Sequence, residues 1–281
     1  MSSKDSQAWT DLQSHVYYMS QSHISTLFQE SPDRFSQFGF AQDDLLLDLS
    51  KQRITDETLS LLIKLAKERD LQGWTEDLFS GKHINDSEDR PALHTALRTP
   101  QGEKLEVDGV EIIEEVHQNL ERMDAIVNKI HSGQWRGYTG HSINTVVNIG
   151  VGGSDLGPFM ACKALSENQP AEARALKVHF VSSMDGSQLA DLLSHLNPAR
   201  TLFVISSKSF TTIDTLANAN TAKEWLKASS NEASESVLVS RHFIGVSASP
   251  DKALSWGIPE SNQLAFWDWT GGRYSMWSTI G

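Results

Sequence analysis

Residues 145–158 read TVVNIGVGGSDLGP, a short β-branched run that leads into a glycine-rich turn. Three more apolar runs of similar length follow, at residues 177–182, 201–205 and 242–246. Helical patterns separate these runs, and the clearest of them repeats leucine on one face and stops at Asn197-Pro198. Strands that are apolar on both faces and alternate with helices indicate a parallel sheet covered on both sides. The pattern therefore predicts an α/β fold with a doubly wound sheet.

The first half of the chain has the periodicity of helices. Apolar residues recur at helical spacing over residues 9–19, and a longer stripe covers residues 113–130. Thr55 suits the N-cap of a further helix, because two acidic residues follow it in the first turn. We therefore expect a helical N-terminal arm with loops over residues 1–110 and the α/β domain over residues 111–281.

Composition excludes several classes of protein. The 281 residues include 24 basic and 36 acidic ones, and the net charge of 24 − 36 = −12 argues against nucleic-acid binding. A single cysteine, Cys162, excludes a disulfide framework, and the ten histidines show no paired metal-ligand spacing. No apolar run reaches the roughly 18 residues of a membrane span. We expect a cytoplasmic globular protein without metal, nucleic-acid or membrane partners.

The first predicted strand ends in a loop that could hold an anion. Glycines at 150, 152 and 153 and the hydroxyl of Ser154 precede a helix, whose first amides favour negative charge. A dinucleotide fingerprint needs a small residue where Asp155 stands, and a phosphate loop of the nucleotide-hydrolase type needs a lysine where Pro158 stands. The alternative is a tight turn that only joins strand to helix.

The third predicted strand ends in the clearest anion signal. Residues 206–212 read SSKSFTT, with five hydroxyls and the ammonium of Lys208 where a helix opens. Hydroxyls, an ammonium and helix amides can all donate to phosphate oxygens, and the composition suits a phosphate monoester. The alternative is a helix-capping segment, although a cap needs only one hydroxyl.

Arg273 is a candidate of a different kind. It follows two glycines, in a segment where residues 256–277 hold four of the eight tryptophans. The arginine could be a buried structural cation stacked on aromatic rings. It could equally be a fixed positive charge that stabilises a developing oxyanion. Composition alone leaves both readings open.

These strand ends, in this order, resemble the glucose-6-phosphate isomerase family. The glycine loop at 149–158, the hydroxyl-rich loop at 207–212 and the Gly-Gly-Arg segment at 271–275 each match a family motif, as does the upstream segment DRPALHTALR at 89–98. The resemblance runs from about residue 29 to residue 281. It implies a sugar isomerase (SIS) sandwich, here the first of two such domains.

The resemblance also implies roles for individual residues. It assigns the sugar to Gly153 and Ser154, and assigns enediolate stabilisation during proton transfer between C1 and C2 to Arg273. It assigns the phosphate to one loop: Ser207, Lys208, Ser209 and Thr212, with Thr211 adjacent. It implies interconversion of glucose 6-phosphate and fructose 6-phosphate, no metal or organic cofactor, and a homodimer.

The resemblance covers only the N-terminal portion of the family. The family's catalytic glutamate, ring-opening histidine and late lysine follow the Gly-Gly-Arg motif, and this chain ends at Gly281 within an apolar run. We therefore expect a fragment without the second SIS domain, inactive on its own. A non-catalytic SIS module that binds a sugar phosphate is the alternative, and Asp155 disfavours a nicotinamide dehydrogenase.

Overall fold

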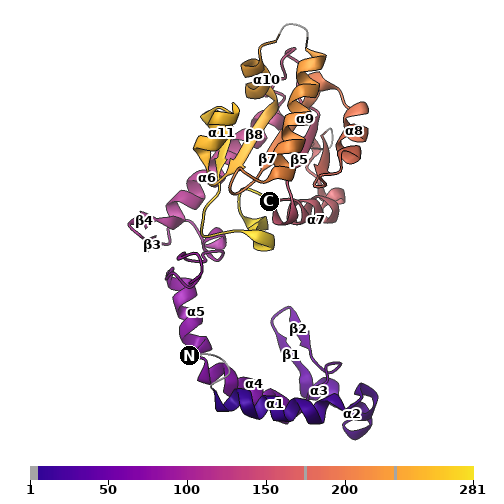
Figure 1. Cartoon of the computed structure of the whole chain (residues 1–281), viewed down its shortest axis with the longest axis vertical. Coiled ribbons are helices and arrows are strands. Elements are labelled where there is room, and N and C mark those ends of the chain that lie inside the picture. The colour runs from indigo at the N-terminus through magenta and orange to yellow at the C-terminus, as the bar shows by residue number, and fades with distance from the viewer. Residues whose placement is uncertain (1–5, 174–175, 231–232) are drawn as a thin grey trace. The chain divides into compact units, whose positions relative to one another are not determined.

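A computed structural model describes residues 6–173, 176–230 and 233–281 of the chain (Figure 1). These residues form two compact units that divide between Asp77 and Leu78. The expected domain boundary near residue 110 stays a prediction, and residues 1–5 of the expected arm lie outside the described residues.

The first unit consists mainly of helices. Its elements are α1 (Gln7–Ser20), α2 (Ile24–Glu30), α3 (Arg34–Phe38), β1 (Gly39–Gln42), β2 (Leu45–Asp48) and α4 (Asp56–Glu68). Helix α5 (Leu71–Ser80) spans the division between the units. The expected helices are confirmed in α1 and α4, and Thr55 caps α4 as predicted, because its hydroxyl accepts a hydrogen bond from the Thr58 amide.

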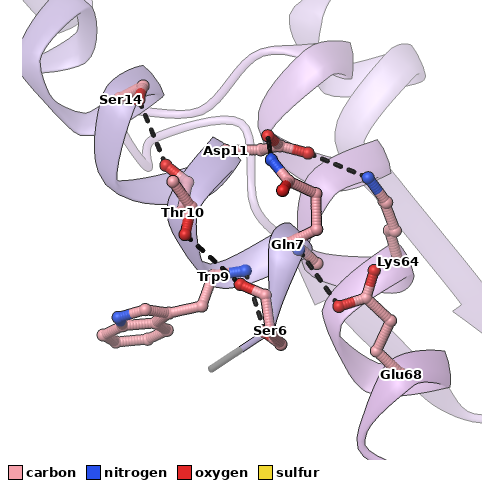
Figure 2. A network of polar contacts seen from close by, with 9 residues as sticks. Ser6, Gln7, Trp9, Thr10, Asp11, Ser14, Lys64 and Glu68 are labelled. Carbon is pink, nitrogen blue, oxygen red and sulfur yellow. Dashed lines mark hydrogen bonds and ion pairs between the residues drawn. The ribbon is translucent and has the colours of Figure 1, made fainter. Parts of the chain in front are cut away.

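Polar contacts join α1 to α4 (Figure 2). Lys64 Nζ donates to the Asp11 carboxylate over 2.8 Å, and Gln7 donates to the same carboxylate over 2.7 Å. The backbone amide of Ala8 donates to the Glu68 carboxylate over 3.0 Å. The Lys64–Asp11 pair is partly exposed, so it orients the two helices but adds little to their stability.

The first half also contains two hairpins that the sequence pattern did not predict. Strands β1 and β2 pair antiparallel around Asp43, which has a left-handed φ of 50°. Strands β3 (Glu106–Val107) and β4 (Val110–Glu111) pair around Asp108 and Gly109, both with positive φ. Aspartate and glycine turns make these hairpins. Hydrophobic alternation does not signal them, because β2 is exposed along its whole length.

The second unit contains a five-stranded parallel sheet, which confirms the expected fold class. Its strands are β5 (Thr145–Ile149), β6 (Lys177–Val181), β7 (Thr201–Ser206), β8 (Phe243–Ser247) and β9 (Gln263–Ala265). Their order in the sheet is β6-β5-β7-β8-β9, and every neighbouring pair is parallel. Four strands agree with the sequence prediction. The three-residue β9 was missed, because its run is too short to show a pattern.

Helices cover both faces of this sheet, and consecutive strand residues serve opposite faces. Phe203 and Ile205 of β7 pack in one core with apolar residues of α8, α9, α10 and α11. Leu202, directly before Phe203 in β7, packs in a second core with α6 and the C-terminal segment. All three side chains are fully buried, which explains the continuous apolar run in the sequence.

Besides the end of α5, the described residues of the second unit form six α-helices. They are α6 (Ile112–His131), α7 (Leu156–Ala164), α8 (Gly186–Ser194), α9 (Ile213–Ser229), α10 (Glu235–His242) and α11 (Pro250–Trp256). Figure 1 shows α9 packed along β5 and β7, whose carboxyl ends point toward its start. Among the described helices, none is both long and apolar enough to cross a bilayer.

Candidate functional site

The strand order places a topological switch between β5 and β7. From β5 the chain moves outward to β6 on one side, and then returns to β7 on the other side. In sheets of this kind, ligands bind outside the carboxyl ends of the two strands where the direction reverses. The glycine loop follows β5 and the hydroxyl-rich loop follows β7, so both candidate loops lie at this switch.

A cavity of about 550 Å³ opens between these loops. The sequence-predicted residues in its wall are Ser154, Ser207, Lys208, Ser209 and Thr212. The other lining residues are Glu88, Arg90, Val151, Thr215, Ser249 and Asp268. Ser154 of the glycine loop and four predicted residues of the hydroxyl-rich loop therefore share one concave surface.

The glycine loop is held by close backbone packing. Gly152 has a φ of +61°, which glycine adopts without strain. Gly153 leaves no room for a side chain, because a Cβ there would overlap the carbonyl of Gly272. Gly153 does not line the cavity. Its place in the structure fits contact with the Gly271-Gly272-Arg273 segment, and any contact with a sugar stays a prediction.

The hydroxyl-rich loop turns sharply at Phe210. The Phe210 amide donates to the Ser207 carbonyl over 3.2 Å, and its φ is +49°. Its ring is 3% exposed and belongs to the core beneath the loop. A buried aromatic side chain thus anchors this loop, while Ser209, Thr211 and Thr212 remain exposed and Ser207 is buried.

The hydroxyls of this loop bond to one another. The hydroxyls of Ser207 and Thr212 lie 3.1 Å apart, and Thr211 donates to Ser209 over 2.7 Å. Thr212 occupies the N-cap of α9 but makes no side-chain capping bond. The capping alternative needs such a bond, so the geometry favours hydroxyls that are available to a ligand.

Lys208 is held by the neighbouring loop. Its Nζ donates to the carbonyls of Asp268 and Thr270, over 2.8 and 2.9 Å. Burial lowers the pKa of Lys208, the Asp268 carboxylate opposes this, and the charge of Arg90 adds to it. An ammonium has three N–H donors. Two are used here, which leaves one for a ligand.

Arg273 lies apart from this cavity. It lines a second cavity of about 480 Å³ together with His94, Arg98 and Tyr274. Its side chain is exposed, which does not fit a buried structural cation. Arg273 is close in sequence to the loop that holds Lys208, but it does not line the same cavity.

Several polar residues of the site were not found from the sequence. Arg90 Nη1 lies 3.1 Å from Asp268 Oδ1 at the rim of the first cavity. Beneath the loops, Asn148 is 7% exposed and donates to the Ser154 carbonyl over 2.9 Å. An asparagine inside an otherwise apolar strand was the available signal for Asn148. Arg90 lies in the motif segment at 89–98, but its sequence context indicates no role for it, because its partner is 178 residues away.

Asp155 is a buried carboxyl group in the glycine loop. It is 7% exposed, its Oδ1 has no partner among the described residues, and it hydrogen-bonds to the Ser182 side chain. Burial raises the pKa of Asp155 above its ordinary value, and the Ser182 bond opposes this. Cys162 is exposed on α7. Within the described residues, no group of three His, Cys, Asp or Glu side chains could hold a metal ion.

The fold and the cavity define a class: a doubly wound α/β protein with an ammonium and several hydroxyls in a cavity at its topological switch. A family model described as phosphoglucose isomerase matches residues 48–281. The chain belongs to the phosphoglucose isomerase family. The resemblance in the sequence motifs is thereby confirmed, and it concerns the N-terminal portion of the family.

Individual relatives agree with this assignment. Glucose-6-phosphate isomerase 2 of Chromohalobacter salexigens is 50% identical and is matched over 98% of this chain and 50% of its own length. A glucose-6-phosphate isomerase of Hydrogenovibrio crunogenus is 49% identical, and the match covers 100% of this chain and 50% of the relative. The solved glucose-6-phosphate isomerase of Chlamydia trachomatis superposes with a TM-score of 0.76 and 25% sequence identity. The superposition covers 99% of this chain and 51% of the solved chain. The chain spans about half the length of these relatives.

Proposed function

We propose that this chain supplies the sugar-phosphate site of an aldose–ketose isomerase that interconverts glucose 6-phosphate and fructose 6-phosphate. One observation carries the proposal: an ammonium and a set of hydroxyls line a single cavity at the topological switch. Family membership supports the substrate class. The isomerase activity of the longer relatives comes to this chain only as part of the proposal.

In this proposal the phosphate binds against the hydroxyl-rich loop. Ser207, Ser209 and Thr212 donate hydroxyl hydrogen bonds, and Lys208 adds its remaining N–H and a positive charge. Thr211 orders Ser209, to which it donates a hydrogen bond. The first amides of α9, left uncapped by Thr212, face the same anion. Ser154 and Gly153 border the sugar from the opposite loop.

Arg273 has a separate role in the proposal. Moving a proton between C1 and C2 creates an enediolate, which a nearby guanidinium stabilises. Arg273 follows Gly272, an exposed residue with a φ of +58°, and this glycine gives the segment freedom to turn. The transfer also needs a base. We expect that base in the part of the relatives that this chain does not span.

The experiment measures binding and turnover separately. Calorimetric titration with glucose 6-phosphate should show saturable binding, and glucose without the phosphate should bind at least about tenfold more weakly, as loss of charge-assisted hydrogen bonds predicts. Lys208→Ala should cause a similar loss. A coupled assay should detect no isomerisation by the 281-residue chain. Equal binding of both sugars, or unchanged binding by the Lys208 variant, would refute the proposal.

A non-catalytic sugar-phosphate-binding module remains the second candidate function. The observation that favours it is the place of Arg273, which lies outside the phosphate cavity. The two candidates differ in the longer protein: an isomerase restores turnover when the remaining half is present, and a binding module does not. Homodimer formation and a cytoplasmic location stay predictions that the family relationship supports.

A further inference from the structure

Two segments that are far apart in sequence lie side by side at the candidate site. Residues 90–94 run along residues 268–271, in the loop that precedes Arg273. The contacts that join them include Arg90 Nη1 to Asp268 Oδ1 (3.1 Å), the Leu93 amide to the Trp269 carbonyl (3.1 Å), and the Gly271 amide to His94 Nε2 (3.2 Å).

Asp268 connects these two adjacent segments to the hydroxyl-rich loop. Its carboxylate is bound by Arg90, and its backbone carbonyl accepts a hydrogen bond from Lys208 Nζ over 2.8 Å. Arg90 therefore binds the side chain of Asp268, and Lys208 binds its backbone. Both cations and the Asp268 side chain line the same cavity.

The carboxylate of Asp268 is also a competitor for Lys208. It is 64% exposed and its charge acts on Lys208, so it can turn toward the ammonium when nothing else holds it. A carboxylate paired with Lys208 would occupy the N–H that a phosphate needs and would repel the dianion. In the structure, Arg90 holds the carboxylate at the rim.

We propose that Arg90 is a positioning residue of the anion site: it holds the Asp268 carboxylate away from Lys208 and so keeps the ammonium free for a phosphate monoester. This inference rests on the proposed function, because it requires Lys208 to bind the phosphate. Arg90 acts through Asp268 and does not itself contact the anion. In the rival role, Arg90 is a second cation that binds the phosphate. The loss of affinity caused by Arg90→Gln would then persist when Asp268→Asn removes the carboxylate.

The test compares the effect of Arg90→Gln in two backgrounds of the full 281-residue chain. With Asp268 present, Arg90→Gln should weaken glucose 6-phosphate binding by at least about fivefold. With Asp268→Asn, the same substitution should change the affinity by less than about twofold, because the competing carboxylate is gone. An undiminished loss in the Asp268→Asn background, or no loss in the first, overturns the inference.

Two controls separate this result from folding and from simple charge effects. An ion pair this exposed adds little stability, so Arg90→Gln should leave the melting temperature nearly unchanged. Glu88→Gln removes one charge from the same cavity at a side chain held by Asn85 instead of Asp268. Its effect gives the size of a pure charge change, which the loss in Arg90→Gln must exceed.

A measurement without ligand keeps the two proposals distinguishable. The pH profile of Lys208 acylation, followed by mass spectrometry, reports how the ammonium is paired. Arg90→Gln should move this profile to higher pH, and the shift should fall to less than half in the Asp268→Asn background. A shift of half or more overturns the inference. Absent phosphate binding by the wild-type chain would refute the proposed function instead.

Discussion

Ser206 Oγ donates to Asn148 Oδ1 over 2.9 Å, a buried hydrogen bond that joins the ends of β7 and β5. The amide nitrogen of Asn148 donates in turn to the Ser154 carbonyl. One side-chain amide therefore links the strand that carries the hydroxyl-rich loop to the glycine loop. The two loops that border the cavity are held in register from below.

Asn148→Leu should destabilise the chain and loosen this register. The substitution keeps the side-chain size but leaves the Ser206 hydroxyl and the Ser154 carbonyl without partners, which costs about 2 kcal/mol of unfolding free energy. Urea denaturation measures the loss. Asn128→Ala, which removes an exposed bond to Asp124 on α6, should cost about 0.5 kcal/mol or less. Equal losses in the two variants would show that the buried link contributes nothing special.

Asp155→Asn should raise stability in a pH-dependent way. Burial raises the folded-state pKa of Asp155, so the unfolded chain gives up this proton first as pH rises. The free energy of unfolding therefore falls as pH rises from the ordinary carboxyl pKa to the raised pKa of Asp155, and the loss is complete above the raised value. Melting temperatures should show a gain for Asp155→Asn at pH 7 that shrinks toward pH 4. A gain independent of pH contradicts this account.

The fold was largely predictable because its strands are buried on both faces. Continuous apolar runs such as residues 201–205 carry that information locally, and the helices between them carry the 3.6-residue period. The three-residue β9 and the hairpin at Asp43 carry neither signal. Their positions depend on partners elsewhere in the chain and on turn geometry, so periodicity could not find them.

The candidate site was predictable only where chemistry is dense in sequence. Five hydroxyls and Lys208 within seven residues identify their own loop. Arg90 and Asp268 are single charged residues in separate segments, and only the folded chain brings them together. The resemblance assigned Arg273 to the same substrate as the phosphate-binding residues, whereas the structure puts it in a second cavity with His94, Arg98 and Tyr274.

Phe210 should tolerate glycine at least as well as alanine, although glycine removes one more carbon. Loss of the buried ring costs about 3–5 kcal/mol in either variant. The φ of +49° strains alanine but not glycine, which offsets the greater flexibility of glycine. Chemical denaturation of Phe210→Ala and Phe210→Gly compares them. A glycine variant clearly less stable than the alanine variant would mean that the turn carries no strain.

The pKa of His83 should lie above its ordinary value, and its contacts with Asp89 and Asp108, called the His83 clasp, should weaken as pH rises. Its Nδ1 lies 2.9 Å from Asp89 Oδ1 and its Nε2 lies 2.9 Å from Asp108 Oδ2, and these two carboxylates raise the pKa of His83. Because the folded-state pKa is raised, the stabilisation is complete below about pH 6.5 and is lost as pH rises through the raised value. Proton NMR titration of the ring measures this pKa directly.

Two variants test whether the His83 clasp depends on both carboxylates. Asp108→Asn removes one acceptor from the turn between β3 and β4, and Asp89→Asn removes the other, next to Arg90. Each should lower the pKa of His83, and together they should return it to the range of a free imidazole. Glu106→Gln, on the same hairpin, makes neither contact and should leave the titration unchanged. A His83 pKa at or below 6.5 in the unmodified chain would remove the basis for the clasp, because the carboxylates would then bind a neutral ring.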